Sequence, residues 1–295
     1  MAEFDFNALT EYVTSSRDET LRDIAQKHGK KYVGSTSSMT GALSQFHFLL
    51  SQWREVNMDM MTSDFSSASS KFTKTFTAPA AIFLRWKNGV YAIDADKQFD
   101  SPNILSMLGK SLEKLLTLPK EQYERYRMSS SNHFTEEEQN QAESYHYSLL
   151  GDFLMRSQLD AHDPRLPGTG MFDLKTRAVV AIRMNVQEYE EGSGYQIRNS
   201  QGKWESFERE YYDMMRATAL KYSLQVRMGR MDGIFVAYHN TERIFGFQYI
   251  SLSELDRALH GQTDLTLGDQ EFSMSIELLN KVLNRATEQF PGEVS

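Results

Sequence analysis

The residues with the clearest chemical potential are two aspartates and a lysine between Gly151 and Ile182. Asp173 and Lys175 occupy alternate positions of an apolar, strand-like run, so their side chains project from the same face. Asp160 ends the preceding apolar run, and a loop rich in Pro and Gly separates it from Asp173. If the two runs pair, Asp160 reaches the same patch. Carboxylates favour Mg²⁺ or Mn²⁺, and an ammonium can offset developing negative charge. The pattern indicates metal-dependent cleavage of a phosphodiester.

A surface ion pair is the competing interpretation of an Asp-x-Lys sequence, and short motifs of this kind arise often by chance. Here the run Met171–Ile182 is apolar on both sides of the charged pair, which predicts burial. Buried charges are costly unless they are paired or hold a metal. The burial therefore favours a functional site.

The segment resembles the PD-(D/E)XK nucleases of the RecB-like branch, whose pattern is an acid, about a dozen residues, and then (D/E)-x-K followed by Thr or Ser. The matching residues here are Asp160, Asp173, Lys175 and Thr176. Leu159 stands where the family has proline. The resemblance implies an α/β fold with a mixed central sheet flanked by helices, as in restriction endonucleases.

Two further elements of that family have counterparts in this chain. Gly109 and Glu113 fit the Gly-x-x-x-Glu form of an upstream helix. Glu208 and Tyr212 are the nearest match to a later Gln-x-x-x-Tyr helix, with Glu in place of Gln. The resemblance implies that Glu113 joins the metal site, and Glu143 is the competing acid.

Longer stretches resemble fungal mitochondrial RNA-processing proteins of the Pet series, which are PD-(D/E)XK relatives. They are Lys30–Arg54, Gly89–Leu118 and Asp160–Arg177. This resemblance implies a mitochondrial 5′-to-3′ exoribonuclease that acts on 5′-phosphorylated single-stranded RNA. It also implies partners such as the mitochondrial RNA polymerase or the RNA-degradation machinery. The alternatives are a non-catalytic RNA-binding or polymerase-docking factor and a DNA exonuclease.

The resemblance gives a set of expected residue roles. Asp160, Asp173, Glu113 and the carbonyl of Leu174 would hold Mg²⁺ or Mn²⁺, and Lys175 would orient or deprotonate the attacking water. Hydroxyls at a helix start can bind phosphate, although N-capping is their commoner role. The residues expected to contact RNA or its 5′-phosphate are Ser37, Ser38, Thr40, Arg177, Glu208 and Tyr212.

Composition agrees with an enzyme that has a sizeable core. The chain has 295 residues, 40% of them hydrophobic, and no cysteine, which excludes disulfides and thiolate zinc sites. No apolar run is long enough to span a membrane. The net charge of −8 is unusual for a nucleic-acid binder, so any basic contact surface must be local. The acidic segment Met1–Arg22 is unlike a mitochondrial presequence, so the mitochondrial setting follows from the resemblance alone.

The patterns predict a helical N-terminal elaboration over residues 1–78 and a nuclease core over 79–295. A helix is expected over Gly41–Arg54, and another is expected to start at Ser101 and to carry Glu113. Hairpins are expected at Ile82–Ile93 and Tyr145–Asp160, a long strand at Met171–Ile182 and one long helix at Trp204–Tyr222. The remaining expected elements are strands at Gly233–Tyr238 and Ile244–Ile250, a helix capped by Ser251, and a helix at Ser273–Phe290.

Overall fold

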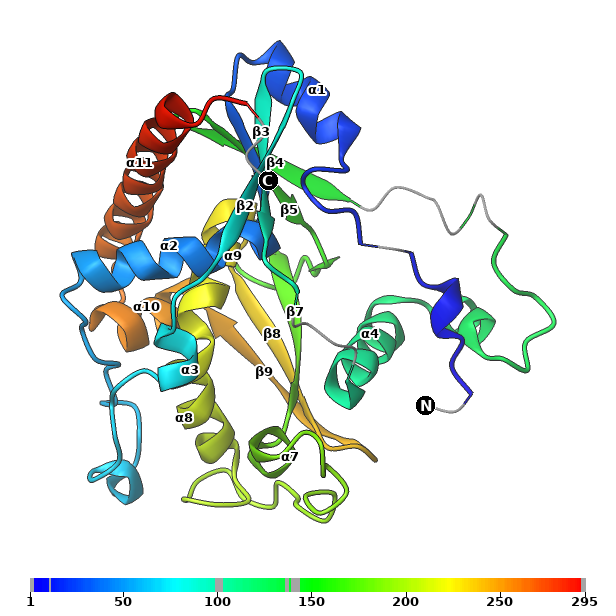
Figure 1. The fold of residues 1–295 in the computed structure, drawn as a ribbon. Coiled ribbons are helices and arrows are strands. Elements are labelled where there is room, and N and C mark those ends of the chain that lie inside the picture. Colours follow the sequence, from blue (N-terminus) through cyan, green and yellow to red (C-terminus); the bar gives the residue numbers. More distant parts are fainter. Residues whose placement is uncertain (1–2, 11, 99–102, 136–137, 139–143, 293–295) are drawn as a thin grey trace.

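The computed structural model describes residues 3–10, 12–98, 103–135, 138 and 144–292, which form a mixed α/β fold (Figure 1). The strands are β1 Tyr32–Ser35, β2 Ile82–Lys87, β3 Val90–Ala95, β4 Tyr145–Leu150, β5 Phe153–Gln158, β6 Ala161–His162, β7 Met171–Ala178, β8 Gly233–His239 and β9 Ile244–Ser251. The helices are α1 Glu19–Lys27, α2 Thr36–Leu50, α3 Lys74–Thr77, α4 Ile104–Thr117, α5 Lys120–Tyr123, α7 Val180–Met184, α8 Phe207–Ala217, α9 Ala219–Gly229, α10 Leu252–His260 and α11 Thr266–Gln289. Short 3₁₀ turns lie at Phe6–Ala8, Ser63–Phe65 and Glu124–Tyr126.

The expected α/β class, with mixed sheets flanked by helices, is confirmed, and the strands form two mixed sheets. The first has the order β2-β3-β1-β5-β4 and the second the order β6-β7-β8-β9. The chain leaves the first sheet after Gln158 and enters the second at Ala161, so Asp160 lies at the crossing point. There the Leu174 N–H of β7 donates a hydrogen bond of 3.0 Å to Asp160 Oδ2. This hydrogen bond therefore fastens the crossing point, which carries Asp160, to β7, which carries Asp173 and Lys175.

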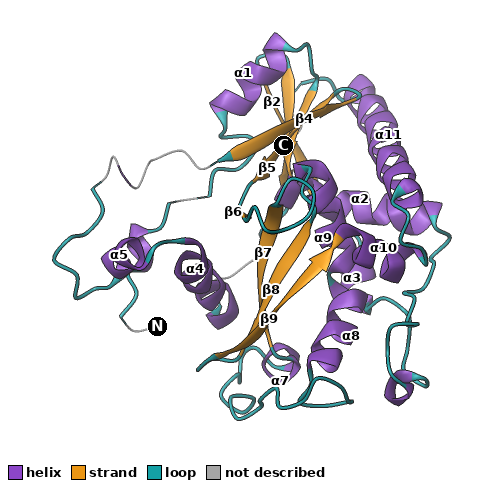
Figure 2. Cartoon of the chain, turned by 180° about the vertical axis from the view of Figure 1, so that it is seen from behind, coloured by secondary structure: helices purple, strands orange, loops and turns teal. Residues whose placement is uncertain are grey.

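Helices cover both sides of this junction (Figures 1 and 2). Helix α9 contacts β5 of the first sheet and β7 and β8 of the second, and α2 packs against α9 and α11. Their shared core includes Leu43, Met155, Leu224, Val236 and Leu279. Helix α4 lies apart from this group and contacts β7. Strand β7 is thus held between α9 on one side and α4 on the other.

Both hairpins are confirmed, as β2–β3 and β4–β5 in antiparallel register. The N-terminal segment contributes more than helices, because β1 lies at the middle of the five-stranded sheet, parallel to β3 and β5. The division at residue 78 therefore remains a proposal, with β1 as the element that links the two parts.

Three element boundaries differ from the expectation. Helix α2 begins at Thr36, because Ser35 and Ser38 form a reciprocal capping box. The long helix after Trp204 is two helices, α8 and α9, which meet at Thr218. Strand β7 ends at Ala178, and α7 follows it. Only the start of α2 is set by a side-chain cap, because neither Val179 before α7 nor Thr218 before α9 makes a side-chain capping hydrogen bond.

The helix that carries Glu113 is confirmed as α4, with Asn103 as its cap. The expected cap, Ser101, lies outside the described residues. Strands β8 and β9 and the Ser251-capped helix α10 are confirmed, and the last helix begins earlier than expected, at Thr266. None of the described helices combines the length and the apolar character that crossing a membrane requires.

Candidate active site

A cavity of about 210 Å³ lies where the two sheets meet, and it gathers most of the predicted catalytic residues. Strand β7 supplies Asp173, Leu174 and Lys175, the crossing point supplies Asp160, and α4 supplies Glu113. Three segments that are distant in sequence therefore converge on one space. That convergence is what the sequence motif predicted.

The charged groups at the centre of the cavity contact one another directly. Lys175 Nζ lies 2.6 Å from Asp173 Oδ2, and both side chains are largely buried. Asp160 hydrogen-bonds through its carboxylate to the Leu174 N–H and to Asp173. Two buried carboxylates thus share one ammonium.

Burial and the nearby carboxylate of Asp173 raise the pKa of Asp160 to about 8. The pKa of Lys175 is also raised. Its burial would lower the pKa, but the charges of Asp173, Tyr222 and Asp160 outweigh burial and raise it. Lys175 therefore stays protonated, and one ammonium cannot neutralise both carboxylates. Asp160 therefore keeps a proton near neutral pH, and a divalent cation with oxygen ligands could replace that proton.

Glu113 lies close enough to Asp160 that its charge adds to the raised pKa of that carboxyl. Its own carboxylate is 3.7 Å from Lys114 Nζ and is about one-third exposed. Glu113 is therefore at the rim of the cavity, where it can complete a metal site. The competing acid, Glu143, lies outside the described residues.

Several residues of the cavity wall were not predicted. They are Tyr12, Ser35, Thr36, Tyr145, Arg156, Gln158 and Gln225. Arg156 pairs with Asp18 in the buried interior. Tyr12 comes from an irregular N-terminal segment, and its hydroxyl bonds to Ser35 and Ser37. On α9, Gln225 lines the cavity and the Tyr222 ring centre lies 5.1 Å from Lys175 Nζ, but the order and spacing of these two residues differ from the Gln-x-x-x-Tyr pattern.

The hydroxyl residues expected to bind phosphate separate into two groups. Ser37 lines the cavity. Ser38 is buried and caps α2 through Ser35, and Thr40 is fully buried. Of the three, only Ser37 lines this cavity.

Arg177 shares the face of Asp173 and Lys175 but does not line the cavity. Its side chain is 5% exposed, and Nη1 lies 3.5 Å from the hydroxyl of Thr218. Burial, with the nearby charge of Arg183, lowers the pKa of Arg177 to about 10. The expectation that Arg177 contacts RNA is therefore corrected, because helices α8 and α9 cover this end of β7.

Glu208 and Tyr212 also lie away from the cavity. Glu208 accepts hydrogen bonds from the N–H groups of Thr62 and Gly202, and the Tyr212 hydroxyl donates to the carbonyl of Ser69. These contacts fasten the loop of residues 62–69 to α8. The expected RNA contact at these positions is replaced by a structural one.

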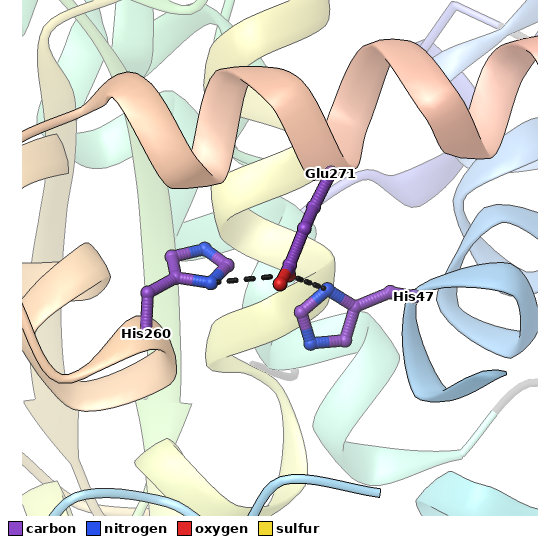
Figure 3. A group of neighbouring side chains, drawn as sticks. All are labelled: His47, His260 and Glu271. Carbon is purple, nitrogen blue, oxygen red and sulfur yellow. Dashed lines mark ion pairs between the residues drawn. The ribbon is translucent and has the colours of Figure 1, made fainter. Parts of the chain in front are cut away.

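A second cluster of possible metal ligands joins α2, α10 and α11 (Figure 3). Glu271 Oε2 lies 3.0 Å from His47 Nδ1 and 3.2 Å from His260 Nδ1. Arg54 Nη2 lies 2.6 Å from Oε1 of the same carboxylate. Burial would raise the pKa of Glu271, but hydrogen bonds from His260, His47 and Arg54 lower it. Because Arg54 already supplies the positive charge, the cluster is explained as a buried ion network.

Glu271→Gln is therefore expected to lower the free energy of unfolding by about 3 kcal/mol, because it removes the buried partner of Arg54. Denaturant unfolding measures the change. Asp269→Asn is the control, since this acid on the same helix is largely exposed and should cost under about 1 kcal/mol. Equal stability of the two variants, or a loss of wild-type stability on chelation that Glu271→Gln abolishes, would contradict a metal-free network.

Comparison with known proteins identifies a matching family and two similar proteins. The family model for the mitochondrial protein Pet127 matches residues 12–284. The mitochondrial mRNA degradation protein pet127 of Schizosaccharomyces pombe is 41% identical over 294 residues, which are 98% of this chain and 55% of that protein. PET127 of Saccharomyces cerevisiae is 46% identical over 255 residues, which are 84% of this chain and 30% of that protein. The chain thus spans about half the length of the S. pombe relative and about a third of the length of the S. cerevisiae relative.

Solved structures of low identity also align with the chain. S. pombe Rai1 in complex with 3′-FADP has a TM-score of 0.47 at 11% identity, over 92% of this chain and 70% of that one. Candida albicans Rai1 in complex with pU5 and Mn²⁺ has a TM-score of 0.38 at 10% identity, over 86% of this chain and 63% of that one. The family match and the sequence relatives confirm the resemblance to the Pet series and its mitochondrial setting. The chain belongs to the mitochondrial Pet127 family.

Proposed function

We propose that this chain is a metal-dependent nuclease that digests single-stranded RNA from the 5′ end in mitochondria. The observation that carries the proposal is the meeting of Glu113, Asp160, Asp173 and Lys175 in one cavity at the junction of the sheets. The name of the S. pombe relative, an mRNA degradation protein, supports RNA as the substrate.

Each residue of the cavity has a distinct proposed role. Asp160, Asp173, Glu113 and the Leu174 carbonyl would hold Mg²⁺ or Mn²⁺, and a bound ion would supply Lewis-acid stabilisation of the phosphoryl charge. Lys175 stays an ammonium beside Asp173, so it suits orienting the attacking water and offsetting negative charge better than removing a proton. Ser37 lines the same cavity and is the proposed hydroxyl contact to RNA.

Glu113→Gln is expected to raise the metal concentration for half-maximal rate by about ten- to a hundredfold, because it removes one carboxylate from the rim of the site. Titration of the cleavage rate with Mg²⁺ and with Mn²⁺ measures the change. Glu121→Gln, an exposed acid on α5, is the matched control. Titration curves of Glu113→Gln that overlay the wild type would show that Glu113 is only a solvated helix acid.

The second candidate function is a non-catalytic RNA-binding or polymerase-docking factor. The net charge of −8 favours delivery by a partner over independent binding to nucleic acid. Against loss of catalysis stands the cost of the cavity, because two buried carboxylates beside one ammonium are expensive to keep without a use. A DNA exonuclease is the third candidate function, because the cavity alone does not distinguish ribose from deoxyribose.

One assay separates these functions. Labelled RNA and DNA of the same sequence, each with a 5′-phosphate or a 5′-hydroxyl, are incubated with the protein in Mg²⁺, in Mn²⁺ and with chelator. The proposal predicts metal-dependent release of nucleotides from the end of 5′-phosphorylated RNA. Binding of RNA without cleavage would support the docking factor, and preferential digestion of DNA would support the third function.

A further inference from the structure

A second groove adjoins the catalytic cavity, and none of the functions above uses it. Its volume is about 530 Å³, and it shares Ser37 with the catalytic cavity. Its walls come from the first turns of α2, the segment before β2, the end of β3 and helix α9. We name it the lysine groove, after Lys97 and Lys221 in its lining.

We propose that the lysine groove holds the nucleotides of RNA next to the bond being cut, with Lys97 and Lys221 contacting successive phosphates. This inference rests on the proposed nuclease function and deepens it by placing the substrate. The volume lies in the range of pockets that bind ligands larger than a single ion. The inference begins from Ser37, which both spaces share, because an RNA strand that leaves the catalytic cavity past Ser37 enters the groove directly.

Helix α9 supplies a second link between the two spaces. Gln225 lines the catalytic cavity, and Lys221 lines the groove. The two residues are four apart, so they share a helix face and are separated by about 6 Å along the axis. That separation is of the order of one nucleotide step. One face of α9 therefore runs from the catalytic cavity to the groove.

Tyr12 and Lys97 form the third link. The Tyr12 ring lines the catalytic cavity, and its hydroxyl bonds to Ser35 and Ser37. Lys97 Nζ lies 4.7 Å from the centre of that ring. Lys97 is exposed, so its ammonium can move from the ring to a phosphate. The contact between Tyr12 and Lys97 therefore connects the catalytic cavity to the lysine groove.

The chemistry of the wall suits a nucleic-acid backbone. Apart from the two lysines and Asp96, the wall is made of small or uncharged residues, among them Gly41, Ala80 and Ala81. Gly41 is in close contact with Ala80, since a Cβ at residue 41 would lie 3.2 Å from Ala80 Cβ. Small side chains leave room for bases and sugars, and the lysines make the groove locally cationic on an acidic protein.

Equilibrium binding tests the inference without needing cleavage. The protein carries Asp173→Asn, the probe is 5′-phosphorylated oligouridine of about 12 nucleotides, and affinity is measured over a range of salt concentrations. Lys97→Ala and Lys221→Ala should each weaken binding several-fold at low salt. Each should also reduce the slope of log affinity against log salt by about 0.7, the value for one lost phosphate contact on a single strand. Lys281→Ala, an exposed lysine on α11, is the control and should change neither.

Ala81→Glu provides an independent variant, because residue 81 is exposed and the change adds negative charge to the wall without disturbing the core. It should weaken binding at least as much as either lysine variant. The inference is overturned if both lysine variants and Ala81→Glu match Lys281→Ala in affinity and in salt slope. If the lysines matter for binding but the wild type never cleaves, the groove stands and the nuclease function fails. If the wild type cleaves RNA and the groove variants bind normally, only the groove fails.

Discussion

Asp173→Asn and Lys175→Ala are each expected to lower the rate of metal-dependent RNA cleavage by about a hundredfold to a thousandfold. Asp173 loses the charge that would bind the cation, and Lys175 loses the ammonium that would offset negative charge on the phosphoryl group. The two groups lie 2.6 Å apart at the centre of the cavity, so each change removes a charged group from the proposed site. Single-turnover rates on 5′-phosphorylated RNA in saturating Mg²⁺ measure the loss.

The fold should survive both changes. Asn at position 173 keeps the size of the side chain and removes repulsion from Asp160, and circular dichroism with a thermal scan checks that the variants stay folded. Asp163→Asn is the control, since this acid lies between the two motif aspartates but pairs with Arg165 at the surface. Near-normal rates in both Asp173→Asn and Lys175→Ala would remove these residues from catalysis.

The sequence was most informative where local pattern decides the structure. Strand alternation places Asp173 and Lys175 on one face, and the loop before them returns Asp160 to the same place. The two hairpins followed from alternation and turn residues in the same way. These features depend on neighbours in sequence, which is why one sequence was enough to find them.

The features that were missed depend on packing between distant segments. Nothing near Asp160 signals that it stands between two sheets, because the change of sheet is set by which strands find partners. Arg177 follows the alternation of β7, yet α8 and α9 bury it. Tyr12 reaches the cavity from an irregular segment that has no periodic pattern. Strand geometry fixes a direction for each side chain, but the covering helices decide whether that direction leads to a cavity or to the core.

The metal-free protein should lose stability as pH rises from about 4 to about 8. The pKa of Asp160 is raised from 3.8 to about 8 by burial and by Asp173, so between these values the folded state holds a proton that the unfolded state has released. Since stability falls with pH wherever the folded state binds more protons, the free energy of unfolding decreases across this window. Above the raised pKa the decrease ends.

Metal binding should show the opposite dependence on pH. A cation bound by Asp160 displaces its proton, so the apparent affinity for Mg²⁺ or Mn²⁺ should rise by about tenfold per pH unit up to about pH 8. Thermal unfolding with and without Mn²⁺, at several pH values, measures both effects. Asp160→Asn should flatten the pH dependence in the metal-free protein and remove the stabilisation by Mn²⁺. Stabilisation by Mn²⁺ that persists in Asp160→Asn with an unchanged pH profile would place the cation elsewhere, and the buried cluster around Glu271 would then be the site to examine.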